Sequence, residues 1–397
     1  MRRYSRRRFA FGGTQSEPAW RTFFSLVCGA LVVSCGLLAG CTRQQETIKI
    51  GHYASLTGKD AAFGVASRKG ALLAVEELNA KGGILGHRIE YLVEDIQSKS
   101  GESATVVKKL ISRDKVVAVL GGNPSTNSLE AAPICQNAKI PMMAISSTNP
   151  KVTEIGDYIF RICFIDPFQG AVLAKFAREK LKAQRVALLT SASAPYSVGL
   201  SNVFRERFTA LGGEIVGEQK YSEGDKDFKA QLTAIRGQKP DVIAATGYYT
   251  EAALICIQAR SLGLDVPIIG GDGWEAPQLV ELGGRAVEGT YYSTHYSASN
   301  AAPEVQAFVK QYRARWNNET PEGVSALAYD AVLLYADAMQ RAGTTDGPKL
   351  RDALAATKNF PGVTGHTTID AQRNSAKPAV ILTVKNGALQ FVDAVAP

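Results

Sequence analysis

Histidine is scarce in this sequence of 397 residues, and the common hydrolase motifs are missing. The four histidines, His52, His87, His295 and His366, lie far apart along the chain. There is no Gly-x-Ser-x-Gly sequence, which would place a nucleophilic serine on a sharp turn, and no His-Glu-x-x-His pair of zinc ligands. We therefore interpret the histidines as structural, and we expect no catalytic residues, no metal site and no cofactor.

A phosphate-binding loop is also missing, although the segment "GHYASLTGKD" begins in a similar way. Such a loop needs four residues between its glycines and a hydroxyl after its lysine, because backbone N–H groups surround the phosphates and the hydroxyl holds Mg²⁺. Here six residues separate Gly51 from Gly58, and Asp60 follows Lys59. An aspartate at that position would repel a phosphate, so we do not expect a nucleotide ligand.

Excess positive charge is almost confined to the N-terminus, although the formal net charge is +8. Residues 1–40 carry six arginines and one glutamate, a net charge of +5, which leaves 8 − 5 = +3 for residues 41–397. The remaining lysines are scattered and form no basic stripe. The sequence therefore gives no electrostatic reason to expect a nucleic acid partner.

The N-terminus resembles the export signal of a bacterial lipoprotein. A basic segment is followed by an uncharged apolar run, Phe23 to Ala39, and then by Cys41. The tetrapeptide "LAGC" at residues 38–41 resembles a lipobox, in which the cysteine is acylated and becomes the new N-terminus. The resemblance implies a signal peptide over residues 1–40, lipidation at Cys41 and a polar tether over residues 41–46.

Two alternatives for this segment stay open. The apolar run could be a transmembrane anchor with an incidental cysteine, although it is short for a span. The sequence Ser5-Arg6-Arg7-Arg8-Phe9 resembles the start of a twin-arginine signal, which would mean export in a folded state. All of these interpretations place the bulk of the protein outside the cytoplasm.

Only three cysteines follow Cys41, namely Cys135, Cys163 and Cys256, and their spacing fits no metal site. In an oxidising compartment, Cys135 and Cys163 could form a disulfide, with Cys256 left as a buried apolar thiol. Three separate buried thiols are the other interpretation. The sequence does not decide between them.

Short apolar segments alternate with longer helical segments from Thr47 onward. Several of these segments are wholly apolar, which is typical of strands in a parallel sheet covered on both faces. The intervening segments have apolar residues at helical spacing, as in residues 62–80, which stop before Gly82-Gly83. The alternation predicts open α/β sheets with ligands at the carboxyl ends of the strands. The predicted strands are "IKIGHY", "RIEYLVED", "VVAVLGG", "IPMMAIS", "RVALLTS", "DVIAATG" and "VPIIGGD".

The alternation breaks at "YIFRICFIDPFQG", which indicates a crossing between two lobes. We expect an extended segment from Tyr158 to Phe164, then Asp166-Pro167 and a new helix, and a second set of strands from Arg185. Later, helices over residues 303–316 and 326–341 precede two final strands. Because these helices have no strands of their own beside them, we expect the chain to return and cover the first lobe.

Hydroxyl side chains come directly after two neighbouring predicted strands. Ser125 and Thr126 come after "VVAVL" at the expected start of a helix, where unpaired N–H groups attract an anion. Ser146, Ser147 and Thr148 come after the next strand, and adjacent strand ends converge on one crevice. These groups could hold a carboxylate. Alternatively, Ser125 is a helix cap and "STNP" a turn.

The strand ends of the second half carry aromatic residues and one acid. Tyr196 lies in "APYSVG", Tyr248 and Tyr249 in "GYYTE", and Asp272 and Trp274 in "GGDGW". Aromatic rings beside a carboxylate can hold an ammonium through charge, phenol hydrogen bonds and cation–π contact. One lobe would then hold a carboxylate and the other an ammonium, which describes an amino acid. Ordinary packing of the tyrosines and a turn at Asp272 are the alternative.

The order and spacing of these motifs resemble the leucine/isoleucine/valine-binding family of type I periplasmic binding proteins, the receptors of ABC importers. The similarity extends from Thr47 to Val392 and includes "NAKGGILG", "AIRGQKPDVI" and "ALAYDAVLLYADA". The resemblance implies two doubly wound, Rossmann-like α/β lobes that are joined by three crossing strands and close around a ligand. Lobe one would comprise residues 47–165 and 295–378, and lobe two residues 166–294 and 379–397.

The resemblance also implies a function and partners. The protein would be a monomeric, non-enzymatic receptor that captures an aliphatic amino acid, branched-chain by preference, and delivers it to an ABC transporter permease. It would act in the periplasm, tethered to the membrane by its lipid. Related receptors take amides or aromatic and other organic acids, and a sensory protein without a transport role is a further alternative.

On lobe one, the family's α-carboxylate site falls on the Ser125 hydroxyl, the Ser146 backbone and Thr148. Phe63, in "GHYASLTGKDAAFG", stands where the family puts an aromatic ring over the ligand. The sequence departs from the family pattern at Ser146-Ser147, where the amino-acid binders carry alanines.

On lobe two, the family's ammonium site falls on Tyr196, Tyr248 and Asp272. Here Asp272 stands where the amino-acid binders carry a glutamate. The shorter acid could leave space for water or for a larger ligand, so the departure affects the ligand's side chain more than its class.

Overall fold

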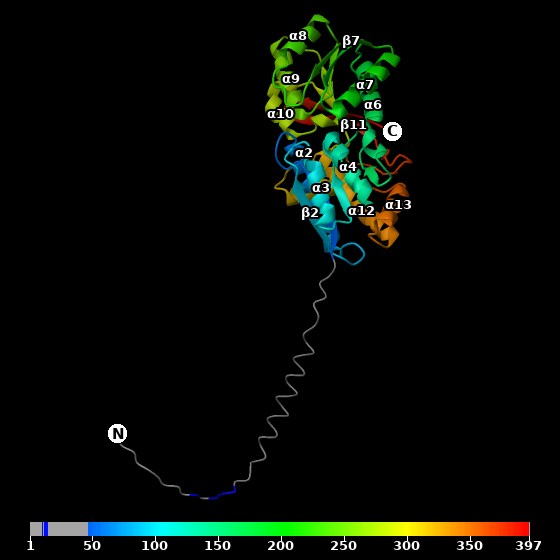
Figure 1. Ribbon diagram of the computed structural model, residues 1–397. Coiled ribbons are helices and arrows are strands. Elements are labelled where there is room, and N and C mark those ends of the chain that lie inside the picture. The colour runs from blue at the N-terminus through cyan, green and yellow to red at the C-terminus, as the bar shows by residue number, and fades with distance from the viewer. Residues whose placement is uncertain (1–9, 11, 15–46, 397) are drawn as a thin grey trace, which may run out of the picture. The chain divides into compact units, whose positions relative to one another are not determined.

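The computed structural model describes residues 10, 12–14 and 47–396 (Figure 1). Cys41, the tether and most of the predicted signal peptide therefore lie outside the described residues. Residues 47–396 belong to one compact unit that contains two β-sheets. Among the described residues, we find no helix with the length and hydropathy needed to cross a membrane.

The first sheet has five strands in the order β2-β1-β3-β4-β5, and all its neighbouring pairs are parallel. β3, β4 and β5 are buried along their whole length, as strands covered by helices on both faces must be. The strands are β1 (Ile48–Ala54), β2 (Ile89–Asp95), β3 (Ala118–Gly121), β4 (Met142–Ala144) and β5 (Ile159–Arg161), and the helices between them are α2 (Ala61–Ala80), α3 (Glu102–Ser112), α4 (Ser125–Ala138) and α5 (Lys151–Glu154).

The second sheet has seven strands in the order β12-β11-β10-β9-β8-β6-β7. Its pairs from β7 to β10 are parallel, whereas β11 pairs antiparallel with both β10 and β12. The strands are β6 (Arg185–Ser191), β7 (Glu214–Tyr221), β8 (Val242–Ala245), β9 (Ile268–Gly270), β10 (Tyr291–Thr294), β11 (Ala379–Lys385) and β12 (Ala388–Val395). The helices of this lobe are α6 (Asp166–Glu179), α7 (Pro195–Ala210), α8 (Lys229–Gly237), α9 (Tyr249–Ser261), the 3₁₀ turn η1 (Asp272–Trp274), α10 (Pro277–Gly283) and the 3₁₀ turn η2 (Gly284–Val287).

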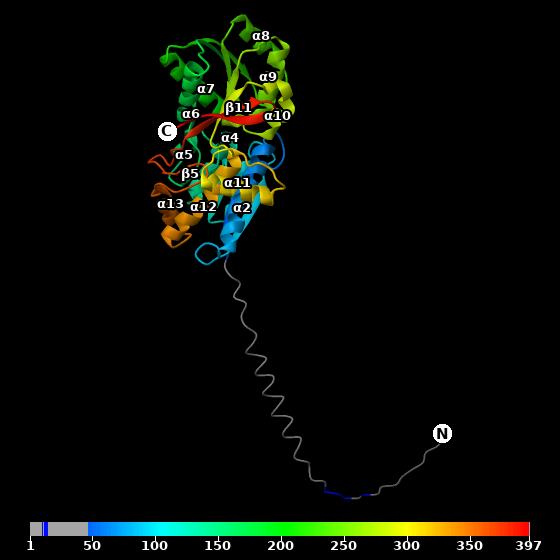
Figure 2. The ribbon, with the colours of Figure 1, turned by 180° about the vertical axis from the view of Figure 1, so that it is seen from behind.

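The late helices return to lobe one. α12 (Gly323–Ala342) packs along α2, and α11 (Pro303–Arg315) and α13 (Gly347–Ala355) lie on the same lobe (Figure 2). The approach of α12 to α2 is close, because a Cβ atom at Gly70 would lie 1.9 Å from the carbonyl oxygen of Ser325. This confirms the expectation that the late helices cover the sheet that is built first.

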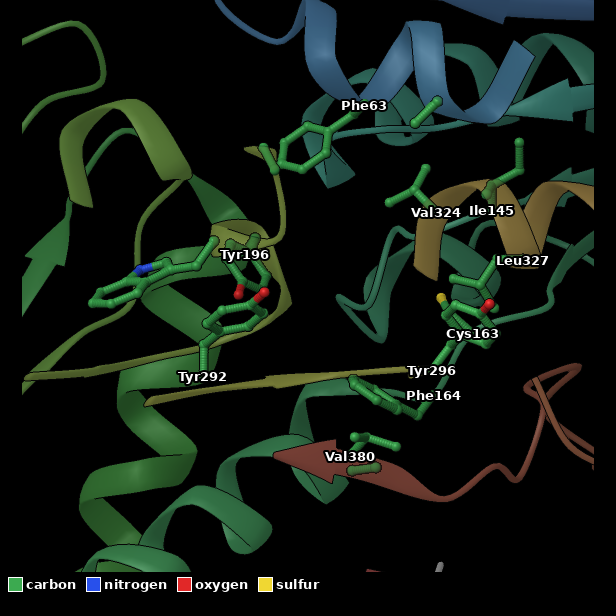
Figure 3. Packing of buried hydrophobic residues seen from close by; sticks show 14 of the residues in the cluster. Phe63, Ile145, Cys163, Phe164, Tyr196, Tyr292, Tyr296, Val324, Leu327 and Val380 are labelled. Carbon is green, nitrogen blue, oxygen red and sulfur yellow. The ribbon is translucent and has the colours of Figure 1, made fainter. Parts of the chain in front are cut away.

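Three connections carry the chain between the lobes, over residues 162–165, 295–302 and 376–378. None of the three is part of a named strand, and the first two contain bends. The first two connections touch, since the ring of Phe164 lies on the ring of His295 with centroids 3.7 Å apart. One buried cluster of apolar side chains spans both lobes, and Figure 3 shows part of it.

One detail of the crossing differs from the expectation. We expected an extended crossing from Tyr158 to Phe164, but Ile159–Arg161 forms β5 and pairs with β4 in lobe one. The backbone groups of these residues are therefore used by the sheet, and the crossing is shorter. The seven strands predicted from the sequence are all present.

Candidate ligand-binding cleft

Six of the seven residues that the sequence singles out for ligand binding line one cavity between the lobes. Thr148 is the exception, because it is fully buried beside the cavity and does not line it. The free space in the cavity is only about 20 Å³, on the order of one water molecule, because side chains of the two lobes close on each other there, so a solute requires the lobes to open. Figure 3 shows Phe63 on α2 and Tyr196 from the opposite lobe in one view. The lining residues are Phe63, Asn123, Pro124, Ser125, Ser146, Tyr196, Tyr248, Asp272 and Gly273.

The lobe-one wall lies where β3 ends and α4 begins. The first N–H groups of α4 have no intrahelical acceptors and stand at the positive end of the helix dipole, so they attract an anion. Asn123 Nδ2 is buried without a hydrogen-bond partner and adds another donor. Pro124, not Ser125, occupies the N-cap position, and the Ser125 side chain does not cap the helix. The alternative interpretation of Ser125 as a helix cap is therefore wrong.

The Ser125 hydroxyl instead accepts a long hydrogen bond of 3.4 Å from the backbone N–H of Asn149. Ser146, half-buried after β4, lies on the same wall, whereas Ser147 points away and hydrogen-bonds Ser128 at 2.9 Å. The wall thus offers hydroxyls and N–H donors without a formal charge.

The lobe-two wall carries two stacked tyrosines. Tyr196 lies in the first turn of α7 and Tyr248 at the N-cap of α9, and their ring centroids are 5.3 Å apart. Burial raises the pKa of both phenols well above their ordinary value, so both remain neutral hydrogen-bonding groups. Tyr196 Oη accepts from the Gly273 N–H at 3.1 Å, while Tyr248 Oη is buried without a partner.

Close packing behind these rings requires glycine at position 271. A Cβ atom there would lie 2.3 Å from Tyr196 Oη, closer than nonbonded atoms approach. The sequence "GGDGW" therefore brings the backbone just after β9 against Tyr196 and places Asp272 at the cavity.

Two side chains that the sequence analysis missed hold the Asp272 carboxylate. Gln169 Nε2 donates to Oδ1 at 2.8 Å, and His295 Nε2 lies 3.2 Å from Oδ2. Both are buried. We interpreted His295 as structural, and its ring does pack in the core, but it also contacts a predicted ligand residue. No spacing in the sequence indicates these contacts, because Gln169 lies 103 residues from Asp272.

Asp166 is a second buried acid near the cavity that the sequence analysis did not single out. It begins α6, is 1 % exposed, and neither carboxyl oxygen makes a hydrogen bond of good geometry. Burial raises its pKa to about 8, so the carboxyl is largely protonated at neutral pH. The Thr148 hydroxyl is likewise buried without a partner. Neither residue lines the cavity.

The turn "LTGKD" joins the two lobes beside the cavity. Lys59 of lobe one forms an ion pair with Glu223 of lobe two, and its carbonyl oxygen accepts from Tyr249 Oη at 2.6 Å. Asn149 Nδ2 donates to the Pro195 carbonyl oxygen at 2.9 Å. The structure thus shows the lobes in direct contact around the cavity.

The part of the chain that the structure describes contains neither a cluster of metal ligands nor a disulfide. No group of three or more His, Cys, Asp or Glu side chains there could hold a metal ion. Cys135, Cys163 and Cys256 are free and buried, so three separate thiols is the interpretation that holds. Burial raises the pKa of the Cys163 and Cys256 thiols to about 12, which makes them poor nucleophiles.

The chain belongs to the periplasmic binding protein family, whose model matches residues 47–388. A leucine-, isoleucine-, valine-, threonine- and alanine-binding protein of Pseudomonas aeruginosa is 30% identical over 82% of this chain and 86% of its own length. The branched-chain amino acid transporter protein LivJ of Streptococcus pneumoniae, solved with isoleucine, is 38% identical, with a TM-score of 0.84 over 89% of this chain and 100% of that one. A Rhodopseudomonas palustris solute-binding protein solved with 3,4-dihydroxybenzoic acid is 26% identical, with a TM-score of 0.79 over 88% and 97%.

The fold is therefore that of a type I periplasmic binding protein, and the protein is an extracytoplasmic solute-binding receptor. The family is one of receptors and not of enzymes.

Proposed function

We propose that the protein binds an aliphatic amino acid, branched-chain by preference, and delivers it to an ABC transporter permease. The α-carboxylate lies against the Ser125 hydroxyl and the Ser146 backbone of lobe one, and Thr148 packs behind them. The ammonium lies against Tyr196, Tyr248 and Asp272 of lobe two. Phe63 covers the ligand from α2.

The observation that carries this proposal is the charge pattern of the cavity. Asp272 is the one formally charged residue among the nine that line it, and the lining residues of lobe one are uncharged. A ligand with one ammonium and one carboxylate complements both walls. A charge on the ligand's side chain would be a third charge and would lack a counterion in the cavity, which favours a neutral side chain.

The relatives support this ligand class. The Pseudomonas protein is named for five small neutral amino acids, and the Streptococcus structure holds isoleucine. An aromatic acid, as in the Rhodopseudomonas structure, would bring no ammonium and would leave the Asp272 carboxylate facing the ligand without a cation. We therefore propose that the cavity binds amino acids in preference to acids that lack an amino group.

A thermal-shift screen against amino acids, amides and small organic acids tests the proposal. A ligand at about 100 times its Kd adds roughly 2.7 kcal/mol to the free energy of unfolding. We expect leucine, isoleucine or valine to raise the melting temperature most. A large shift with an aromatic acid and none with any amino acid would contradict the proposal.

We also propose that Cys41 is acylated, that the protein is a monomer and that its lobes comprise residues 47–165 with 295–378 and residues 166–294 with 379–397. The lipobox sequence supports the anchor. The sheet strands support the lobe boundaries, since β1–β5 span residues 48–161 and the second sheet draws on residues 185–294 and 379–395.

A further inference from the structure

The Asp272 carboxylate contacts one side chain of the second connection between the lobes and one of the helix that follows the first connection. Gln169 lies in the first turn of α6, which begins where the connection over residues 162–165 ends. His295 is the first residue of the connection over residues 295–302. Each of these side chains contacts a different carboxylate oxygen, Gln169 at Oδ1 and His295 at Oδ2. We call the three residues the hinge carboxylate cluster.

The chemistry of the cluster fixes which atoms donate. An ionised carboxylate only accepts hydrogen bonds, so Gln169 must present its NH₂ group and His295 its protonated Nε2. Gln169 Oε1 and His295 Nδ1 are then buried acceptors, and neither has a hydrogen-bond partner. Burial lowers the pKa of His295, which keeps the ring neutral with one N–H. Gln169 and His295 thus direct their N–H groups to Asp272, while Gln169 Oε1 and His295 Nδ1 have no hydrogen-bond partner.

Packing holds the cluster in place. The His295 side chain is fully buried, and its ring lies on Phe164 of the other connection with centroids 3.7 Å apart. Gln169 is also fully buried. Asp272 stands at the boundary, since it is 7 % exposed and lines the cavity. Two of its lone pairs therefore face the hinge, and the others remain for the cavity.

We propose that Gln169 and His295 are positioning residues that fix the Asp272 carboxylate for a ligand ammonium, so that the hinge sets the preference for an amino acid over the matching acid without an amino group. This inference rests on the proposed function, because it presupposes an ammonium in the cavity. A carboxylate with two fixed donors keeps its orientation when the cavity is empty. A ligand ammonium then binds a carboxylate that is already oriented, so binding does not include the entropic cost of fixing the Asp272 side chain.

Isothermal titration calorimetry of the full chain with leucine and with 4-methylpentanoate, the same skeleton without the amino group, tests the inference. His295→Leu removes one donor and keeps the apolar packing on Phe164. Since a hydrogen bond to a charged group is involved, we expect leucine affinity to fall about tenfold or more. Affinity for 4-methylpentanoate should change less than about twofold. Gln169→Leu, in α6, should likewise lower the affinity for leucine relative to the affinity for 4-methylpentanoate.

Recovery of leucine affinity in a conservative variant is a second measurement, and a purely structural role of His295 would not predict it. His295→Gln places an amide N–H near the position of the ring Nε2, and leucine affinity should return to within about threefold of wild type. His52→Leu is the matched control, because His52 is also buried but does not line the cavity. It should lower stability and leave the ratio of the two affinities unchanged.

Equal losses for both ligands in the Leu variants, or equal losses of leucine affinity in His295→Leu and His295→Gln, would overturn the inference while leaving the proposed function intact. A wild-type protein that binds no amino acid would overturn the two together. A selective loss of leucine affinity with rescue by glutamine supports the assignment.

Discussion

Phe63 of lobe one packs edge-on against Tyr249 of lobe two, with ring centroids 5.1 Å apart and ring planes at 81°. The ion pair of Lys59 with Glu223 joins the turn before α2 to the same lobe. Neither Lys59 nor Glu223 lines the cavity. The contact between the lobes is thus made partly by side chains that do not face the ligand site.

Removing the ion pair should weaken ligand binding without touching the cavity. In Glu223→Gln the closed arrangement loses a partly exposed pair, so we expect amino-acid affinity to fall by less than about fivefold and the difference from wild type to shrink at high salt. Glu218→Gln is the matched control, because Glu218 pairs with Arg205 inside lobe two. Calorimetry that shows the same loss in both variants would contradict a role for Lys59 and Glu223 in closure.

The two lobes could be predicted from the sequence because the apolar pattern of a buried strand lies within a few consecutive residues. Buried parallel strands such as β3 and β8 are apolar throughout, and that signal needs no partner to be recognised. β7 was missed because it is mostly half-buried or exposed and Gly217 interrupts it. β5, with three residues, is too short to stand out from the crossing beside it.

For the site, the sequence indicated the residues at the strand ends but not the residues that pack behind them. Tyr196, Tyr248 and Asp272 come at strand ends, where the fold places ligands. Gln169 and His295 reach Asp272 through tertiary packing of the connections, which leaves no spacing in the sequence. Thr148 was expected at the cavity and lies behind its wall, because the turn after β4 buries it completely.

Asp166→Asn should stabilise the ligand-free protein at neutral pH. The folded-state pKa of about 8 exceeds the ordinary value of 3.8, so between these values folding requires uptake of a proton, and the stability contributed by this group is lost as pH rises. An amide removes that penalty, which is on the order of 4 kcal/mol at pH 7. Urea unfolding at pH 5 and pH 8 should show a larger gain at pH 8. A variant that is equally or less stable than wild type at pH 8 would argue against a buried, protonated Asp166.

His52 should make the protein sensitive to acid. Its buried ring bonds Tyr91 Oη at 2.5 Å, and burial lowers its pKa from 6.5 to about 3. In this window the unfolded state binds a proton that the folded state does not, so stability is lost as pH falls, by about 1.4 kcal/mol per pH unit for one proton. His52→Gln cannot take up that proton. The stability difference between wild type and variant should therefore decline from pH 6.5 to pH 4 in denaturant titrations, and a difference independent of pH would refute this account of His52.

Cys41→Ser should abolish lipid anchoring. Two acyl chains hold a protein stably on a membrane, and serine cannot form the thioether that carries them. We expect the variant to appear in the soluble fraction or to retain its signal peptide, as measured by fractionation and intact mass. Membrane association and mass like those of wild type would rule out acylation at this cysteine. A Cys28→Ser variant, altered within the apolar run, serves as control and should remain anchored.

The division of labour between the lobes is the central claim, and calorimetry of Asp272→Asn and Ser125→Ala with leucine and 4-methylpentanoate tests it most directly. Loss of the Asp272 charge leaves a buried ammonium without its partner, so leucine binding should weaken by roughly 2–5 kcal/mol while 4-methylpentanoate binding hardly changes. Ser125→Ala removes one hydrogen bond to the carboxylate that both ligands share, so it should weaken both by about 1.5–3 kcal/mol. If Asp272→Asn instead weakens both ligands equally, Asp272 does not bind the ammonium, and the amino-acid assignment is contradicted.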